Sequence, residues 1–368
     1  RIEKTGGRSL RVTLSGVQST FLHRLTMPCA FIISRDDYLN GGRVIGCGPF
    51  TVAQWRQDEQ IVLERFPGYY GPRPALEGMV FKIIPEDLTA RFEFMNGALD
   101  YFDIPYMSDI DFTGRASRVV TVPELGVHYV ALNTQRPPFD NREFRRALNL
   151  AVDRRAVMKA LFKNRFEEAR GVVPGGTADY ASAGRTFRFD PDEAARIVRR
   201  LGLEGARIVL LIKADSQVSL IAQMLQHYLG RAGLRVEVTP LEWSALKSRT
   251  FRGDFEMAYF TWVADYPEPE NFLYPLFYSK NAGAGGNRSF YRNAAVDRML
   301  DAARGTLERQ KRFDIYRRVE RIIIDDSPWI FLWYSDKRIA LGRRVGEYVP
   351  CPVFSGMKGD RITLVKSP

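Results

Sequence analysis

The chain has 368 residues, of which 45% are hydrophobic and 26% are charged. This length exceeds the usual size of a single hydrophobic core, so two or more lobes are expected. The sequence contains no run of about 18 apolar residues, which excludes a membrane-spanning helix of ordinary length. Its 54 basic and 43 acidic residues give a net charge of +11. The basic residues are spread along the chain, so the charge does not predict a nucleic-acid partner.

Neither a metal site nor a disulfide framework is supported by the sequence. The cysteines and histidines are Cys29, Cys47, Cys351, His23, His128 and His227. Their wide spacing fits no zinc site, so we expect no metal and no other cofactor. One disulfide among the cysteines stays open, and the histidines are expected in the core or on the surface.

The first third of the chain predicts strands interrupted by one helix. In order, the expected elements are strands at residues 9–14, 51–55, 61–65, 79–84, 98–104 and 127–133, and a helix at 88–96. The second and third strands have the spacing of a hairpin. Gly97 follows the helix as its stop. Because a strand, a helix and a strand follow one another over residues 79–104, we predict a βαβ unit in a mixed sheet.

The remainder is predicted to be mostly helical. The expected helices are at residues 141–152, 154–162, 191–201, 218–229, 243–252, 296–303 and 307–324, with strands at 208–212, 235–238 and 328–334. Asp153 and Asp190 are placed as N-caps, where a side-chain oxygen accepts a first-turn N–H. Gly202 is placed as a helix stop. The order of elements over residues 208–238 predicts a second βαβ unit, in another sheet.

The segment 259–277 has the most unusual pattern, and it reads YFTWVADYPEPENFLYPLF. It begins as an alternating strand and is cut by Pro267 and Pro269, which predicts a strand running into a turn. At the junction Asp265 stands between Trp262 and Tyr266. An acid so placed either binds its own backbone within the turn or anchors a cationic group of a ligand. The residue types alone leave both interpretations open.

Five motifs occur along the chain in a characteristic order. They are GCGPFTVAQW at 46–55, IVLERFPGYYG at 61–71, FKIIPEDLTARFEFMNGALD at 81–100, LNTQRPPFDNREFRRALNLAVDR at 132–154 and WVADYPEPENF at 262–272. In sequence and order they resemble the family 5 extracellular solute-binding proteins, which are the oligopeptide and dipeptide receptors of ABC importers. The resemblance extends over essentially the whole chain.

The resemblance implies an α/β fold of the two-lobed periplasmic-binding-protein (Venus-flytrap) class with mixed sheets, in which hinge closure encloses the ligand. We expect residues 1–134 to form the first lobe, 135–330 the second lobe, and 331–368 to return to the first. Members of the family normally have a long portion before the point at which this chain starts. The first lobe is therefore expected to be incomplete at its N-terminus, either in a fragment or in a natural truncation.

The resemblance also implies ligand-binding residues. In oligopeptide-binding relatives the aspartate of the Ala-Asp-Tyr turn pairs with the α-ammonium of the peptide, and this position is Asp265 here. Trp262 and Trp243 resemble residues that line side-chain pockets. The main chain of Trp262 and Val263 is expected to bind an extended peptide as an added strand.

Tyr266, Asn133 and Arg249 complete the expected site. Arg249 is included as a cation for the carboxylate of the peptide, because the sequence departs from the family at the usual arginine positions. Those positions hold Thr250, Tyr259 and Ser216. Recognition of the carboxylate, and with it the length of the peptide, is therefore the least defined part of the prediction.

The predicted function is that of a non-catalytic receptor, which binds peptides or similar amine-bearing solutes between two lobes and delivers them to a membrane ABC permease. We expect a periplasmic or extracellular monomer, associated with the membrane through its permease. A hydrolase using Asp265, Glu268 and Glu270 is the enzyme alternative, but we expect the two glutamates to lie on the surface. An effector-binding sensor domain of a larger regulatory protein, and a receptor for an oligosaccharide or a metal chelate, are further alternatives.

Overall fold

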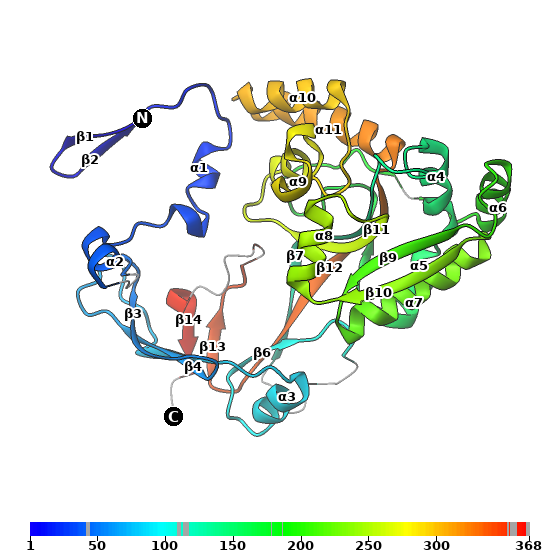
Figure 1. The fold of residues 1–368 in the computed structure, drawn as a ribbon. Coiled ribbons are helices and arrows are strands. Elements are labelled where there is room, and N and C mark those ends of the chain that lie inside the picture. Colours follow the sequence, from blue (N-terminus) through cyan, green and yellow to red (C-terminus); the bar gives the residue numbers. More distant parts are fainter. Residues whose placement is uncertain are drawn as a thin grey trace. The chain divides into compact units, whose positions relative to one another are not determined.

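The computed structural model describes residues 1–41, 45–108, 112, 118–177, 179–185, 187–351, 353 and 359–365. The chain divides into two compact units (Figure 1). Unit 1 comprises Arg1–Arg24 and Leu125–Ser335, and unit 2 comprises Leu25–Glu124 and Asp336–Pro368. The chain passes from one unit to the other after Arg24, within β7 (Arg118–Leu132) and within β12 (Trp329–Leu341). The lobe boundaries expected after residues 134 and 330 stay a prediction.

Unit 1 is built on a mixed sheet with the strand order β10, β9, β11, β7, β12. β9 (Arg207–Lys213) and β10 (Arg235–Leu241) pair in parallel and are joined by helix α7 (Ser216–Arg231), which confirms the second predicted βαβ unit. β11 (Met257–Val263) is antiparallel to β7 along its whole length. At the other edge of this part of the sheet, the short strand β8 (Glu167–Glu168) pairs with β12.

Helices surround this sheet, and capping residues fix where several of them begin. Asp153 accepts a hydrogen bond from the N–H of Ala156 at 3.0 Å, and Asp190 accepts one from Glu193 at 2.9 Å, which confirms both predicted N-caps. The other unit 1 elements are β1 (Ile2–Gly6), β2 (Ser9–Val12), α1 (Phe21–Arg24), α4 (Arg142–Ala151), α5 (Arg154–Phe162), α6 (Pro191–Arg200), α8 (Trp243–Phe251), α9 (Glu270–Phe277), α10 (Ala294–Gly305) and α11 (Arg309–Asp326).

The core of unit 1 is rich in aromatic rings. Its largest fully buried side chains include Tyr129, Phe139, Phe144, Phe162, Phe272, Phe277, Phe313, Tyr316, Trp329 and Trp333. The rings of Tyr129 and Trp329 stack with centroids 3.6 Å apart, and Phe277 lies 4.6 Å from Trp329. These contacts join the sheet to α9, and α9 in turn packs against α10 and α11 (Figure 1).

Unit 2 contains smaller sheets. β3 (Phe50–Arg56) and β4 (Gln60–Arg65) form the predicted hairpin, and β5 (Gly78–Lys82) pairs with β4. β6 (Tyr101–Ile104) instead pairs with residues 338–341 of β12. The predicted βαβ unit over residues 79–104 is therefore wrong, because the strands on either side of α3 (Asp87–Met95) belong to different sheets.

The remaining elements of unit 2 are α2 (Arg35–Gly41), β13 (Val345–Tyr348), β14 (Ile362–Leu364) and the short turns Pro28–Ala30 and Gly359–Arg361. One core cluster packs residues of β12, β13 and β14 together, and another forms around Phe94, Phe102 and Phe112. Gly97 follows α3 with a φ of +79°, so the predicted helix stop is confirmed. In the described ranges, no helix combines the length and the apolar character that a bilayer requires.

Candidate functional site

The end of β11 presents main-chain groups that lack a strand partner. The N–H of Ala264 donates to the carbonyl oxygen of Leu125 on β7 at 2.8 Å. Because main-chain groups of successive strand residues point to opposite edges, those of Thr261 and Val263 face away from β7. On that side β9 pairs with Met257–Ala258 only. Among the described strands nothing pairs with the rest of this edge, which we call the free edge of β11.

Asp265 lies two residues after the end of β11, beyond Ala264, and is half-buried. Its N–H donates to Oδ1 of Asn271 at 3.0 Å, and Nδ2 of Asn271 lies 3.4 Å from Oδ2 of Asp265. Within the part of the chain that the structure describes, the other carboxylate oxygen, Oδ1, has no hydrogen-bond partner, and no turn N–H donates to the carboxylate. The arrangement leaves one oxygen of a half-buried carboxylate able to accept a hydrogen bond.

The two aromatic residues beside Asp265 occupy different environments. Trp262 is half-buried, and its indole N–H donates to the main-chain oxygen of Asn271 at 3.1 Å. Tyr266 is buried, and its hydroxyl donates to the carboxylate of Glu270. Burial, followed by the negative charge of Glu270, raises the pKa of Tyr266 above its usual range, so this hydroxyl stays protonated.

The remaining predicted site residues lie on other elements beside β11. Trp243 begins α8 and is 40% exposed, with its ring centroid 6.3 Å from that of Phe260 on β11. Asn133 is buried and bonded within the protein, since its Nδ2 donates to the carbonyl oxygens of Gly253 and Phe255 at 3.0 and 3.1 Å.

Arg249 is also paired within the protein. Its Nε lies 3.3 Å from both the main-chain oxygen and Oδ2 of Asp254. Asn133 and Asp254 lie beside the start of β11, whereas Asp265 lies beyond its end. At about 3.3 Å per strand residue, roughly 20 Å separates the two ends. The structure thus gathers Trp262, Val263, Asp265 and Tyr266 at one end of the strand and leaves Arg249 near the other.

Two acids that follow Asp265 lie in the interior rather than on the predicted surface. Glu268 and Glu270 are buried, with exposed fractions of 2% and 1%, so the expectation of surface glutamates is wrong. Glu270 pairs with Arg24 of α1, lies 3.6 Å from Arg304 of α10, and accepts from Thr20 at 3.3 Å. These partners are more than 30 residues away in sequence, and no local pattern identifies them.

Glu268 has a separate cation. Its Oε1 lies 3.5 Å from the guanidinium of Arg312 on α11, which is itself buried, and 3.9 Å from Nε2 of His23. Burial of a carboxylate is costly unless a cation and hydrogen-bond donors accompany it. We refer to Glu268, Glu270, Arg24, Arg304 and Arg312 as the buried ion cluster. Its two acids follow Asp265 in the chain by three and five residues.

His128 on β7 is a buried neutral histidine beside this strand. Its Nδ1 lies 2.6 Å from the hydroxyl of Tyr259 and 3.0 Å from Oγ1 of Thr261. Burial lowers its pKa from 6.5 to about 3. His128 therefore lies in the core, which is one of the two places, core or surface, predicted for the histidines.

We expect this histidine to make unit 1 acid-sensitive. The unfolded chain binds a proton near pH 6.5, whereas folded His128 binds one only near pH 3, so stability falls as the pH drops below 6.5. By about pH 5 the loss due to His128 should reach about 2 kcal/mol. Urea unfolding across this range should therefore show a smaller loss for His128→Gln than for the native chain. The control is His227→Gln, which changes an exposed histidine and should lose as much stability as the native chain. Equal losses for the native chain and His128→Gln would show that His128 does not cause the acid sensitivity.

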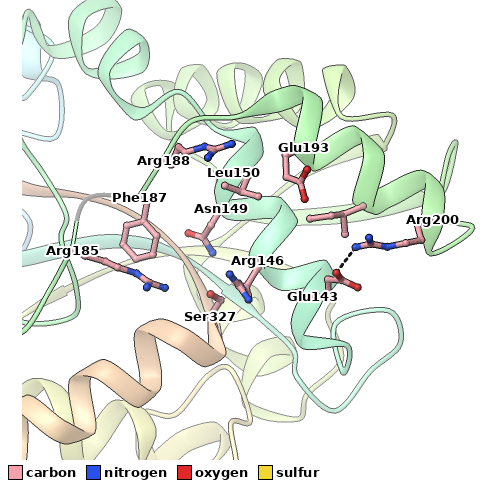
Figure 2. Close-up of a pocket in the computed structure, with 11 residues that line it drawn as sticks. Glu143, Arg146, Asn149, Leu150, Arg185, Phe187, Arg188, Glu193, Arg200 and Ser327 are labelled. Atoms are coloured by element: carbon pink, nitrogen blue, oxygen red, sulfur yellow. Dashed lines mark hydrogen bonds and ion pairs between the residues drawn. The ribbon is translucent and has the colours of Figure 1, made fainter.

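A cavity of about 790 Å³ lies elsewhere in unit 1 (Figure 2). It is lined by Glu143, Arg146, Asn149, Leu150, Arg185, Phe187, Arg188, Glu193, Ile197, Arg200 and Ser327. Three of its arginines already have acidic neighbours: Arg200 pairs with Glu143, Arg185 with Asp325 and Arg188 with Asp190. The cavity shares no residue with the turn that carries Asp265.

The structure contains free thiols at all three cysteines, which leaves no disulfide between them. Across the residues that are described, no group of three or more histidine, cysteine, aspartate or glutamate side chains is placed to hold a metal ion.

Comparison with known proteins places these features in a family. Residues 1–284 match the family described as Bacterial extracellular solute-binding proteins, family 5 Middle, and the chain belongs to it. The sequence assignment and the predicted role as a solute-binding protein are thereby confirmed. The family is extracellular and consists of binding proteins.

Two curated relatives illustrate the range within the family. Heme-binding protein A of Haemophilus influenzae is 27% identical over 95% of this chain and 67% of its own length. Probable di/tripeptide-binding protein 5 of Pseudomonas aeruginosa is 27% identical over 90% of this chain and 66% of its own length. The chain therefore spans about two thirds of the length of these relatives.

Solved structures share the fold. The periplasmic binding protein DppA of Helicobacter pylori, which is associated with an ABC transporter and was solved with the peptide STSA, matches all of this chain and 74% of its own at a TM-score of 0.87 and 25% identity. A dipeptide-binding protein from Pseudoalteromonas, solved with Met-Leu, matches 99% of this chain and 75% of its own at a TM-score of 0.86 and 22% identity. The predicted α/β fold of the two-lobed periplasmic-binding-protein class is confirmed.

Proposed function

We propose that the chain is the receptor of an ABC importer and binds peptides through their free amino terminus at Asp265. The observation that carries this proposal is the free oxygen of the half-buried Asp265 carboxylate, placed just beyond the free edge of β11. A peptide α-ammonium is a cation with three N–H donors, and such an oxygen can accept a hydrogen bond from one of them. The DppA protein bound to a peptide supports the same class of ligand.

The free edge also supports the direction in which the peptide lies. An extended peptide added to this edge would bond with the main-chain groups of Thr261 and Val263. Because β11 runs toward Asp265, a peptide whose amino terminus meets that residue runs antiparallel to the strand. The main chain of Trp262 faces β7, so in this proposal Trp262 contributes its ring and Thr261 replaces it as a main-chain partner.

Peptide length decides which further residues take part. An extended peptide covers about 3.3 Å per residue, so a dipeptide held at Asp265 ends far short of Arg249. A peptide needs at least about six residues to run the length of β11 toward Arg249. We therefore assign Arg249 to longer ligands and do not use Asn133, whose amide hydrogens are already donated to Gly253 and Phe255.

We also propose that binding proceeds without catalysis. The enzyme alternative needs Glu268 and Glu270 as acid and base, but both carboxylates lie in the buried ion cluster beside arginines. A carboxylate held in this way is not available to a substrate. We further propose that the chain delivers its ligand to a membrane permease and acts as a monomer.

Asp265→Ala tests the proposal. A pool of randomised tetrapeptides is incubated with the purified chain, and the retained peptides are identified by mass spectrometry and titrated by calorimetry. Losing one partner of a buried, hydrogen-bonded charge pair costs about 2 to 5 kcal/mol, so binding should weaken by roughly 30-fold or more.

The matched control is Asp314→Ala, which removes an exposed acid that pairs with Arg317 on α11. Its affinity should stay within about twofold of the native value, because Asp314 is exposed and is not part of the proposed site. Retention of no peptide by the native chain, or equal affinities for the native chain and Asp265→Ala, would refute the proposal.

A further inference from the structure

Asn271 links the two side chains at the centre of the proposed site. It is the second residue of α9 and is 5% exposed. Its main-chain oxygen accepts the indole N–H of Trp262, and its side-chain Oδ1 accepts the N–H of Asp265. No function of this residue was indicated by the sequence, although it lies only six positions after Asp265.

The side chain of Asn271 acts on the carboxylate as well as on the backbone. Its Nδ2 lies on the side of Oδ2, at 3.4 Å, and so leaves Oδ1 of Asp265 as the open oxygen. Asp265 comes after the last β11 residue and before α9, where no ladder of strand or helix bonds fixes its main chain. The Asn271 amide therefore orients Asp265, which the secondary structure does not do.

Asn271 is itself held firmly. Its N–H donates to the main-chain oxygen of Glu268 at 3.0 Å, and the preceding residue, Glu270, is fixed by Arg24 and Tyr266. The buried ion cluster thus anchors the first turn of α9, and Asn271 transmits this fixed position to Asp265. A side chain placed in this way is suited to aim a carboxylate without touching the ligand.

We propose that Asn271 is a positioning residue, which aims the open oxygen of Asp265 and thereby sets the preference for ligands with a free ammonium group. This inference rests on the proposed function, because it assigns a cation to Asp265. It predicts that Asn271 matters only while the Asp265 carboxylate is present and the ligand is positively charged at its amino terminus.

The test uses one pool that mixes randomised tetrapeptides with their N-acetylated forms in equal amounts. Mass spectrometry of the retained peptides gives a selectivity ratio, free over acetylated, for each variant. Since both forms compete for the same folded molecules, a partly unfolded variant still yields a valid ratio. The variants are Asp265→Ala, Asn271→Leu, Asn271→Ala and the double variant of Asp265→Ala with Asn271→Leu.

We expect Asn271→Leu and Asn271→Ala to lower the ratio by about 10-fold, the effect of losing one hydrogen bond to a charged group. In the Asp265→Ala background the added Asn271→Leu change should leave the ratio unchanged, which separates positioning from general structural damage. Asn287 is the matched control, because it is buried and its side chain, among the described residues, bonds only to main-chain groups of Tyr278 and Tyr291. Asn287→Leu should leave the ratio unchanged.

Two results would overturn the inference while leaving the proposed function intact. One is a ratio within about twofold of the native value for Asn271→Leu and Asn271→Ala. The other is an equal drop caused by Asn271→Leu with and without the Asp265 carboxylate. If instead the native chain retains no peptide or shows no preference for free amino termini, the proposed function fails and the inference fails with it.

Discussion

Replacing Glu270 by alanine is expected to lower the free energy of unfolding of unit 1 by about 3 to 5 kcal/mol. The substitution leaves the guanidinium groups of Arg24 and Arg304 without their acid and removes the acceptor of the Tyr266 hydroxyl. Breaking a buried ion pair costs more than the pair contributed, because the remaining charge stays partly desolvated. The effect should extend to ligand binding, since α9 carries Asn271.

Tryptophan fluorescence during urea unfolding suits this measurement. Four of the five tryptophans belong to unit 1, namely Trp243, Trp262, Trp329 and Trp333. The control is Glu237→Ala on β10, whose ion pair with Arg207 is exposed and should contribute less than about 1 kcal/mol. A loss for Glu270→Ala no larger than that of the control would show that the cluster is not stabilising.

The Glu320→Ala substitution on α11 is expected to lower the free energy of unfolding of unit 1 by roughly 4 kcal/mol. Glu320 is fully buried, and its two carboxylate oxygens accept hydrogen bonds from four groups. The donors are the N–H groups of Val172, Val173 and Ala183, at 3.0 to 3.1 Å, and the Tyr180 hydroxyl at 3.0 Å. Alanine would leave the buried N–H groups of Val172 and Val173 and the partly buried N–H of Ala183 unsatisfied, which costs more than the bonds themselves contribute.

The same carboxylate explains a glycine in the adjoining loop. A Cβ on Gly171 would lie 2.5 Å from Oε1 of Glu320, so the loop approaches the acid more closely than other residues allow. Glu320→Gln is the informative companion variant, since it keeps the shape but turns one acceptor into a donor facing other donors. Urea unfolding should place it between the native chain and Glu320→Ala, and a native-like Glu320→Ala would contradict this account.

Local signals in the sequence predicted those parts of the fold that depend on neighbouring residues. The caps at Asp153 and Asp190 and the stop at Gly97 need only a few adjacent positions, and all are confirmed. The βαβ unit of β9, α7 and β10 also lies within one short stretch of chain. Where the partner of a strand is distant, prediction failed, since β6 pairs with a strand more than 230 residues later.

The candidate site shows the same division. The place of Asp265, at the end of a strand and before a turn, followed from the local pattern and is seen in the structure. The aromatic segment after the prolines proved to be helix α9, because Pro269 occupies the N-cap, where a missing N–H costs nothing. The pairing of β11 with β7 decides which residues of β11 turn their main-chain groups toward the free edge. The alternation of side chains in the sequence does not show which residues these are.

The connection of the two units through β7 and β12 has a consequence for biosynthesis. Unit 1 ends at Ser335, whereas unit 2 requires Asp336–Pro368 as well as Leu25–Glu124. A ribosome releases the chain from its N-terminus, so the residues of unit 1 have all emerged before unit 2 has received its last strands. Phe102 and Ile104 of β6, which are buried in the finished protein, must wait for residues 338–341 to appear. Residues Leu25–Glu124 of unit 2 are synthesised early but completed late, so during translation they are the part of the chain most exposed to chaperones and proteases.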